Sequence, residues 1–288
     1  MKVPLRSLLF APGSEPRKLQ KVSGFGADAV VADLEDAVAD SKKLAAREHV
    51  RAAVDTSTAS NFMVRINGPE SDLWIDDLES VVSARLAGIV VPKIEHSDHL
   101  FDVAARLSVL EESMGLPAGG IVLIGLVETP LGMSRVDDLA QQAPRRTRTF
   151  ALGSADLSTE LDIELTVEGT ELLYARSRLV MAVRAAGLEA PIDGPFLSIA
   201  DGAGLLRNSQ GARSLGFQGR VAIHPSQVEI VHAAFGAVSE EALTAARGIV
   251  EAFESAEAQG RASIRVDDRF VDYPIYQNAR KLLDRASS

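Results

Sequence analysis

The 288-residue sequence contains no cysteine, one tryptophan and only 5% aromatic residues. Without cysteine the chain can form no disulfide, no thiolate nucleophile and no zinc–thiolate site. The absence of disulfides suits a reducing compartment, and we expect the protein in the cytoplasm. We interpret the single Trp74 as a packing residue, because a lone tryptophan is more often part of a core than of a recognition site.

Positive charge is also scarce: 30 Lys and Arg residues stand against 40 Asp and Glu residues, a formal net charge of −10. This balance argues against a nucleic-acid partner. An acidic chain that binds an anionic substrate must supply a local cationic pocket. No apolar run is long enough to span a membrane, and the first residues enter a short apolar strand rather than a signal sequence. We therefore expect no membrane partner.

What the chain does contain is a series of short apolar runs that alternate with segments of helical periodicity. We count eight strand–helix pairs, with strands at residues 7–12, 28–36, 62–67, 88–93, 121–128, 149–156, 190–195 and 219–225. This uninterrupted alternation predicts a closed parallel TIM (β/α)₈ barrel over residues 1–236. In this fold the active site lies at the C-terminal ends of the strands.

Residues 237–288 follow the eighth pair and are predicted to form a C-terminal helical extension. We expect a helix over 239–258, a polar stretch over 265–274 that is typical of a hairpin, and a last helix over 275–285. The extension is too long to serve only in closing the barrel. We expect it to act as a lid or as an arm that packs on a neighbouring subunit.

Two of the predicted strands each end on a single carboxylate. The apolar run over 121–127 leads into Glu128, and the run that begins at Thr149 ends on Asp156. Both carboxylates should meet at one rim, and Mg²⁺ prefers a few carboxylates with waters that a substrate can replace. The alternative is that each acid caps a helix. Two acids at the same depth favour the metal site.

Further ionisable residues fall at the same predicted rim. Glu35 and Asp36 follow the second strand, and Lys93 ends the fourth as a candidate substrate-binding residue. Arg65 lies in the apolar third strand, where an unpaired charge would be costly. Its partner is either a substrate carboxylate, which it can bind in a bidentate manner, or Asp33 or Glu35. The acids either ligate a metal through water or hold arginines in place.

The first β–α connection carries a positive cluster of Arg17, Lys18 and Lys21. Such a cluster is either a solvated helix face or a phosphate site on a loop at the catalytic rim. The sequence leaves both interpretations open.

Nine short motifs run through the chain in a fixed order. They are LFAPG (9–13), DLEDAV (33–38), VRIN (64–67), VPK (91–93), VET (127–129), ADL (155–157), LLYARS (172–177), IHPSQ (223–227) and VDYP (271–274). Each is modest alone, but together the chain resembles, over nearly its whole length, the citrate lyase β-subunit-like enzymes of the HpcH/HpaI aldolase superfamily, which includes malyl- and citramalyl-CoA lyases.

The resemblance implies a TIM-barrel, Mg²⁺-dependent carbon–carbon lyase that acts on a 3-hydroxyacyl-CoA such as malyl-, citramalyl- or citryl-CoA. It implies that Glu128 and Asp156 hold the metal, with Glu128 beside the substrate. Arg65 would hold the substrate's carboxylate or enolate oxygen. Glu35 and Asp36 would order metal-bound waters and the surrounding shell.

The resemblance also implies a role for the ends of the chain. Asp272 matches an acid that relatives contribute from the C-terminal segment of a neighbouring subunit for proton transfer. Arg17 and Lys18 would face the phosphates of coenzyme A. A homotrimer or hexamer is therefore expected.

Three departures from the family pattern leave the acyl substrate open. Residues 128–132 read ETPLG where relatives often read ETARG, residues 155–157 read ADL where many read EDL, and GSADLS (153–158) resembles the keto-acid aldolase branch. Two alternatives remain: a metal-dependent 4-hydroxy-2-keto-acid aldolase that releases pyruvate, and a non-catalytic citrate-lyase-like subunit. CoA dependence separates the first from the lyase. Intact Glu128, Asp156 and Arg65 argue against the second, because buried charges at one rim serve no purpose in an inactive barrel.

Overall fold

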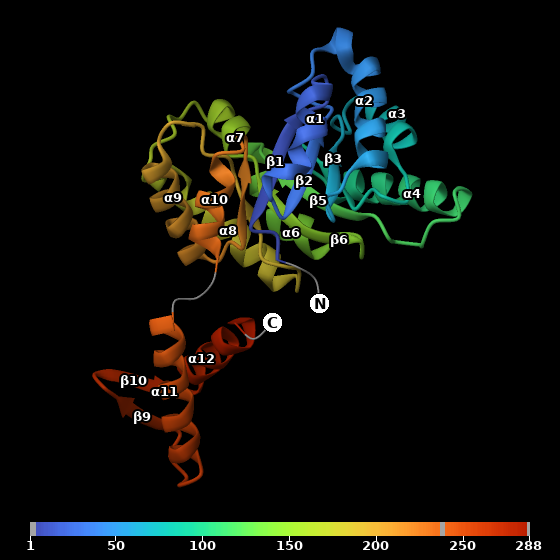
Figure 1. Ribbon diagram of the computed structural model, residues 1–288. Helices are drawn as coiled ribbons and strands as arrows, with labels where there is room; N and C mark the ends of the chain where they lie inside the picture. The colour runs from blue at the N-terminus through green and yellow to red at the C-terminus, as the bar shows by residue number, and fades with distance from the viewer. Residues whose placement is uncertain (1–3, 237–239, 287–288) are drawn as a thin grey trace. The chain divides into compact units, whose positions relative to one another are not determined.

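The computed structural model describes residues 4–236 and 240–286. The contacts divide the chain into two compact units, Met1–Phe235 and Gly236–Ser288 (Figure 1). Within the described ranges, none of the helices combines the length and the apolar character that a membrane crossing requires. The two units are described separately below.

The first unit is a closed barrel of eight parallel strands in sequence order, which confirms the predicted TIM barrel. The strands are β1 (Ser7–Pro12), β2 (Ala29–Asp33), β3 (Phe62–Arg65), β4 (Gly88–Val91), β5 (Val122–Val127), β6 (Thr147–Leu152), β7 (Ile192–Asp193) and β8 (Gly219–Ala222). Seven of these strands have four to six residues, and β7 has only two.

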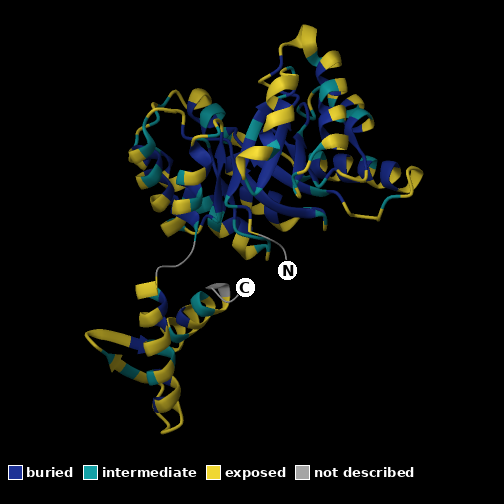
Figure 2. Cartoon of the chain, viewed as in Figure 1, coloured by how far each residue is buried: buried dark blue, intermediate teal, exposed yellow. Residues whose placement is uncertain are grey.

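Helices surround this barrel and turn one apolar face toward it (Figure 2). They are α1 (Pro16–Val22), α2 (Lys43–Thr56), α3 (Leu73–Val81), α4 (Ser97–Ser113), α5 (Pro130–Ser134), α6 (Val136–Gln141), α7 (Ser154–Glu160), α8 (Leu173–Ala185), α9 (Gly202–Leu215) and α10 (Gln227–Phe235), with 3₁₀ turns η1 (Ser23–Phe25), η2 (Asp40–Lys42) and η3 (Thr170–Leu172). The segment between β5 and β6 forms two helices rather than one, because the backbone of Arg135 leaves the helical region between α5 and α6. Trp74 packs against the core, as predicted.

The core has two layers, one inside the barrel and one between the barrel and its helices. Val31, Met63 and Ile124 belong to the inner layer. Side chains along a strand alternate between its two faces, so every second residue faces inward. The same alternation brings Asp33, Arg65 and Glu128 to the inner face at the C-terminal ends of their strands.

The seventh strand is much shorter than predicted, because only Ile192–Asp193 pairs where 190–195 was expected. Pro191 and Pro195 flank this pair, and proline cannot donate a hydrogen bond to a neighbouring strand. As a result β7 pairs at one position with β6 and at two positions with β8.

The chain that leads into β5 is fixed by a buried ion pair. Glu111 is 1% exposed; it pairs with Arg146 at 2.9 Å and accepts hydrogen bonds from the backbone N–H groups of Gly119 (2.9 Å) and Ile121 (3.0 Å). Burial alone would raise the pKa of Glu111, but the arginine and the two N–H groups outweigh it and lower the pKa. The pair therefore anchors the strand that ends beside Glu128.

The second unit contains α11 (Glu240–Glu257), the antiparallel hairpin β9 (Ser263–Val266) and β10 (Arg269–Asp272), and α12 (Tyr273–Ala286). The predicted hairpin and two helices are present, although the predicted start of the first helix at residue 239 lies outside the described residues. Phe253 of α11 stacks on Tyr276 of α12, with ring centroids 4.8 Å apart. Packing on a neighbouring subunit stays a prediction.

Candidate active site

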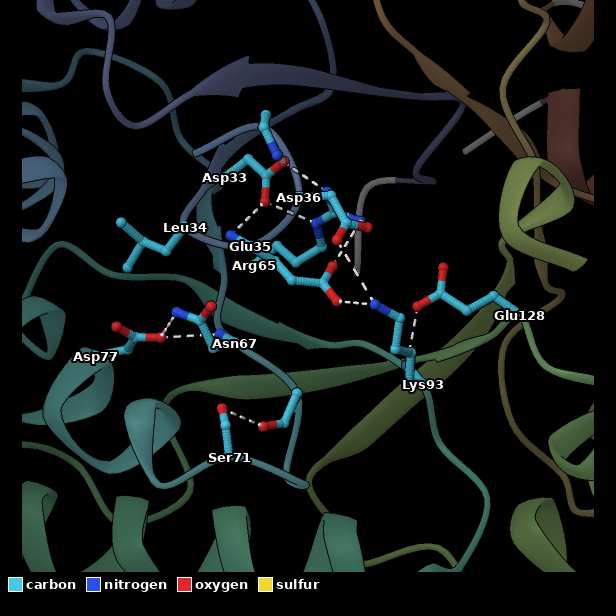
Figure 3. A network of polar contacts seen from close by, with 12 residues as sticks. Asp33, Leu34, Glu35, Asp36, Arg65, Asn67, Ser71, Asp77, Lys93 and Glu128 are labelled. Carbon is cyan, nitrogen blue, oxygen red and sulfur yellow. Dashed lines mark hydrogen bonds and ion pairs between the residues drawn. The ribbon is translucent and has the colours of Figure 1, made fainter. Parts of the chain in front are cut away.

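Arg65 is held by Asp33, the last residue of β2, and by Glu35 in the loop that follows (Figure 3). Asp33 and Arg65 are register partners on β2 and β3, and Asp33 accepts hydrogen bonds from Nε (2.7 Å) and Nη2 (2.5 Å) of Arg65. Nη1 pairs with Glu35 at 2.9 Å, and the guanidinium lies 5.4 Å from the ring centre of Phe10. Arg65 was predicted to pair either with a substrate carboxylate or with Asp33 or Glu35. The structure shows it paired with Asp33 and Glu35.

Asp33 also fixes the loop behind β2. Its carboxylate accepts hydrogen bonds from the backbone N–H groups of Glu35 (3.0 Å) and Ala37 (3.2 Å). The sequence indicated Asp33 only as a possible partner of Arg65, whereas the structure places it at the centre of the cluster. The acids here were predicted either to ligate a metal through water or to hold arginines in place. The structure shows that Asp33 and Glu35 hold Arg65.

Lys93 connects the acids after β2 with the acid after β5. Its ammonium lies 2.9 Å from Oε1 of Glu35 and 3.6 Å from Asp36, while its backbone N–H donates to Oε1 of Glu128 at 2.9 Å. The backbone of Lys93 has a φ of 51°, a left-handed conformation that costs a non-glycine residue about 1–2 kcal/mol. This conformation lets one residue serve Glu35 and Glu128 together.

The acids keep both cations charged. Burial would lower the pKa of Lys93, but its hydrogen bond to Glu35 and the charges of Glu35, Asp36 and Glu128 raise it. Burial acts on Arg65 in the same way and is outweighed by Asp33, Glu35 and Glu128, so its pKa is also raised. Lys93 is therefore a fixed ammonium group.

Glu128 and Asp156 meet, as the sequence predicted. Glu128 is 1% exposed, and Asp156 lies close enough to affect its pKa. Burial first, and then the nearby Glu35 and Asp156, raise the pKa of Glu128 well above its ordinary value. Gly153 makes room for this carboxylate, because a Cβ at this position would collide with the side chain of Glu128.

The position of Asp156 differs from the prediction in one respect. β6 ends at Leu152, and Asp156 lies in the first turn of α7 rather than at the end of the strand. Neither acid caps a helix: Thr129 is the N-cap of α5 and Gly153 that of α7. The N-cap alternative is therefore wrong for both acids, although Asp156 lies in the first turn of α7, where a carboxylate stabilises the helix dipole.

The charges at this rim are unbalanced, because five carboxylates surround two cationic side chains. The carboxylates belong to Asp33, Glu35, Asp36, Glu128 and Asp156, and the cations to Arg65 and Lys93. In the part of the chain that the structure describes, no group of three or more His, Cys, Asp or Glu side chains is arranged to hold a metal ion. A pair of carboxylates with excess negative charge is nevertheless the donor set that Mg²⁺ accepts.

The structure does not bring every predicted residue to this cluster. Arg17 and Lys18 lie exposed on α1, directly after the loop that follows β1. Asp272 ends β10 in the second unit. The roles of these three residues stay predictions.

Sequence reasoning missed the support behind β3. Asn67 donates from its backbone N–H (2.8 Å) and its side-chain amide (2.6 Å) to Asp77, and Asp77 accepts from Nε of Arg47 at 2.7 Å. This buried chain of contacts links α2 and α3 to the loop after Arg65. The only available signal was the polar Asn67 directly after an apolar strand.

Comparisons with known proteins agree with this architecture. Residues 6–225 match the family model for HpcH/HpaI aldolase/citrate lyase. A citrate lyase subunit beta from Haemophilus influenzae is 33% identical over 98% of this chain and 97% of its own length. A (3S)-malyl-CoA thioesterase from Cereibacter sphaeroides is 33% identical over 99% and 95%. The crystal structure of protein CitE from Mycobacterium tuberculosis, in complex with magnesium, acetoacetate and coenzyme A, has a TM-score of 0.82 at 28% identity and covers 100% of both chains.

Proposed function

Because the chain belongs to the HpcH/HpaI aldolase/citrate lyase family, we propose that it is a Mg²⁺-dependent carbon–carbon lyase. Its proposed substrate is a 3-hydroxyacyl-CoA such as malyl-, citramalyl- or citryl-CoA, which it cleaves to an acyl-CoA and a keto acid. The observation that carries the proposal is the buried Glu128 with the half-buried Asp156 close to it, beside the charged Arg65. The CitE complex with magnesium and coenzyme A supports it.

Glu128 and Asp156 are the residues that would hold the ion. They fit it because the rim carries an excess of carboxylates and because the two side chains lie close enough for Asp156 to raise the pKa of Glu128. When bound, Mg²⁺ supplies positive charge that stabilises an oxygen on which negative charge develops.

Arg65 is proposed to bind the substrate's carboxylate or the oxygen that becomes an enolate. Nη1 forms an ion pair with Glu35 and Nη2 donates to Asp33, and each of these nitrogens carries two N–H groups, so at least one N–H of each stays available. The structural ion pairs and a substrate role are therefore compatible. Because Asp33 and Glu35 fix the guanidinium beforehand, it needs little reorganisation as charge develops.

Cleavage needs a base that takes the proton of the substrate's hydroxyl group and an acid that returns a proton to carbon. The electrons of the broken C–C bond pass to the thioester carbonyl, and the former alcohol becomes the keto group. Lys93 is held as an ammonium ion and so cannot act as an amine nucleophile. We propose Asp272, from a neighbouring subunit of a homotrimer or hexamer, as the proton donor.

Coenzyme A also needs a cationic surface. We propose that Arg17 and Lys18, which are exposed near the start of α1, face its phosphates. Glu35 and Asp36 are then assigned to hold Arg65 and Lys93 and to order water around the metal.

A second candidate function is hydrolysis of the same class of thioester. The similarity to a (3S)-malyl-CoA thioesterase over 99% of the chain favours it. The two reactions give different products, because a lyase releases a keto acid and keeps the thioester, whereas a thioesterase releases free CoA thiol.

The test is to incubate the purified protein with malyl-, citramalyl- and citryl-CoA, first with Mg²⁺ and then with EDTA. We expect Mg²⁺-dependent release of a keto acid without free thiol. Free thiol in the absence of a keto acid would establish the thioesterase instead. If neither product forms, cleavage of a free 4-hydroxy-2-keto acid distinguishes the aldolase from a non-catalytic subunit.

The metal assignment has its own variant. Glu128→Gln removes one charge of the proposed metal site, and we expect turnover to fall by about 100-fold or more with the fold retained. Glu70→Gln, an exposed glutamate in the loop after β3, is the matched control. Calorimetric titration with Mg²⁺ should show weaker binding only in Glu128→Gln. Equal Mg²⁺ affinity in both variants would show that Glu128 is not a ligand.

A further inference from the structure

A cavity of about 450 Å³ lies outside the barrel wall, among residues of α8, α9 and the segment before α8. The lining residues that matter here are Glu168, Gly169, Leu173, Arg176, Arg207 and Leu215. The cavity contains none of the residues of the candidate active site, so the proposed function assigns it no role.

Behind the cavity lies a buried cluster with unequal charges. Asp193 of β7 accepts from Nε (3.0 Å) and Nη2 (2.9 Å) of Arg176 and also pairs with Arg220 of β8. Asn208 accepts from both arginines, at 2.9 Å and 2.6 Å. The side chains of Arg176, Asp193 and Arg220 are 7%, 0% and 1% exposed. Two guanidinium groups thus share one carboxylate inside the protein.

One edge of Arg176 remains available. Nε and Nη2 are used by Asp193 and Asn208, and Nη1 makes no hydrogen bond to any described residue. Nη1 lies against Gly169, where a Cβ would collide with it and where φ is +66°. Glycine therefore keeps this edge uncovered at the wall of the cavity. A guanidinium edge that borders a cavity and makes no hydrogen bond to a described residue can bind an anion.

The rest of the lining determines what kind of anion fits. Arg207 of α9 adds a second, exposed guanidinium, and Leu173 and Leu215 supply apolar walls. Two acids lie nearby. Glu171 accepts hydrogen bonds from the backbone N–H and the hydroxyl of Thr166, both at 2.8 Å, and it also lies close enough to Arg176 for that charge to lower its pKa. Glu168 is exposed at the cavity and disfavours an anion of more than one charge.

We propose that this cavity is a binding site for a small monocarboxylate with a short alkyl chain. The carboxylate binds between Nη1 of Arg176 and the guanidinium of Arg207, and the alkyl chain lies along Leu173 and Leu215. The site is separate from the barrel mouth, because Asp193 is on the outer face of β7 while its neighbour Ile192 is in the inner core.

The test uses butyrate as the probe, titrated into the full-length protein by calorimetry with sodium chloride as the ionic-strength reference. We expect saturable binding that Arg207→Glu weakens by about tenfold or more, since it reverses a charge-assisted contact. Arg85→Glu makes the same charge change at an exposed site that is not part of the cavity lining and should leave the affinity unchanged. Phosphate should bind more weakly than butyrate.

A second variant tests whether butyrate binds in this cavity by filling the cavity with a larger side chain. A Cβ at Gly211 in α9 meets no atom within 4 Å, so Gly211→Leu places its side chain in the cavity without a backbone clash and should abolish butyrate binding. Gly248→Leu, at an equally open position of α11, is the control. The proposal is overturned if butyrate does not bind, if phosphate binds as tightly, or if binding survives both Arg207→Glu and Gly211→Leu in folded protein.

Discussion

Replacing Asp33 with asparagine tests whether the protein itself holds Arg65 in place. Asparagine keeps the shape of the side chain but removes the charge, and its amide N–H group faces groups that are themselves donors. Asp33 accepts four hydrogen bonds, two from Arg65 and one each from the backbone of Glu35 and Ala37. Each carboxylate oxygen accepts two of these hydrogen bonds, so an amide nitrogen in place of either oxygen loses two contacts together with the charge of the buried pair.

The loss of stability in Asp33→Asn depends on the ion pair that Arg65 retains with Glu35. Removing one partner of a buried ion pair costs about 3–5 kcal/mol. Glu35 still lies 2.9 Å from Nη1, so we expect the lower end, about 3 kcal/mol of the free energy of unfolding. For a domain of this size, such a loss lowers Tm by roughly 6–12 °C.

The assay is urea and thermal unfolding of Asp33→Asn beside Asp36→Asn. Asp36 makes the same kind of contacts at longer range, 3.9 Å to Arg65 and 3.6 Å to Lys93, but its side chain is 50% exposed against 3% for Asp33. Water screens such a pair, so Asp36→Asn should cost less than about 1 kcal/mol. Equal losses of stability in the two variants would refute the reasoning that Asp33 anchors Arg65.

Two further variants test the frame of the site. The folded-state pKa of Glu111 is lowered, so its carboxylate stabilises the barrel above its unfolded pKa of about 4.3, and this contribution is lost as the pH falls through the folded pKa. Urea unfolding should therefore show that Glu111→Gln destabilises the protein at neutral pH but not at acidic pH. Glu112→Gln should have little effect at either pH. A loss of stability in Glu111→Gln that does not depend on pH would contradict this expectation. Gly153→Ala places a Cβ where Glu128 lies and should lower Mg²⁺ affinity and turnover by about 100-fold, while Gly68→Ala, which meets open space, should change neither. Equal behaviour of the two glycine variants would show that Glu128 does not need the space beside Gly153.

The barrel could be predicted from the sequence because short apolar runs alternate with segments of helical periodicity, and several of these runs lead into a charged residue. Asp33, Arg65 and Glu128 show why this works: alternation along a strand places them on the inner face, and the ends of parallel strands lie at one rim. The sequence could not decide whether Arg65 serves a substrate or Asp33, because both supply a carboxylate.

The boundary between β6 and α7 could not be predicted because its residues favour neither element. Leu152, Gly153 and Ser154 are small or apolar and continue the pattern of the strand, although the helix already begins at Ser154. Gly153 directly follows the strand, and a Cβ there would collide with the side chain of Glu128, a contact between residues distant in sequence that no local pattern records.

The cluster behind the cavity was missed for a different reason. Arg176, Asp193 and Asn208 come from α8, β7 and α9, so no spacing in the sequence connects them. Arg220 did carry a signal, since it is a charged residue within an apolar strand, and the argument applied to Arg65 predicts a buried partner for it as well.

The two-residue strand β7 has a consequence for how this barrel can change during evolution. With only three backbone register positions to its neighbours, the seam at β7 is closed to a large extent by Asp193 and its two arginines. Loss of Asp193 alone would leave two buried cations, and loss of either arginine alone would open a cavity beside an under-coordinated carboxylate. The three positions form an epistatic unit, so a lineage can exchange them for apolar residues only through correlated substitutions.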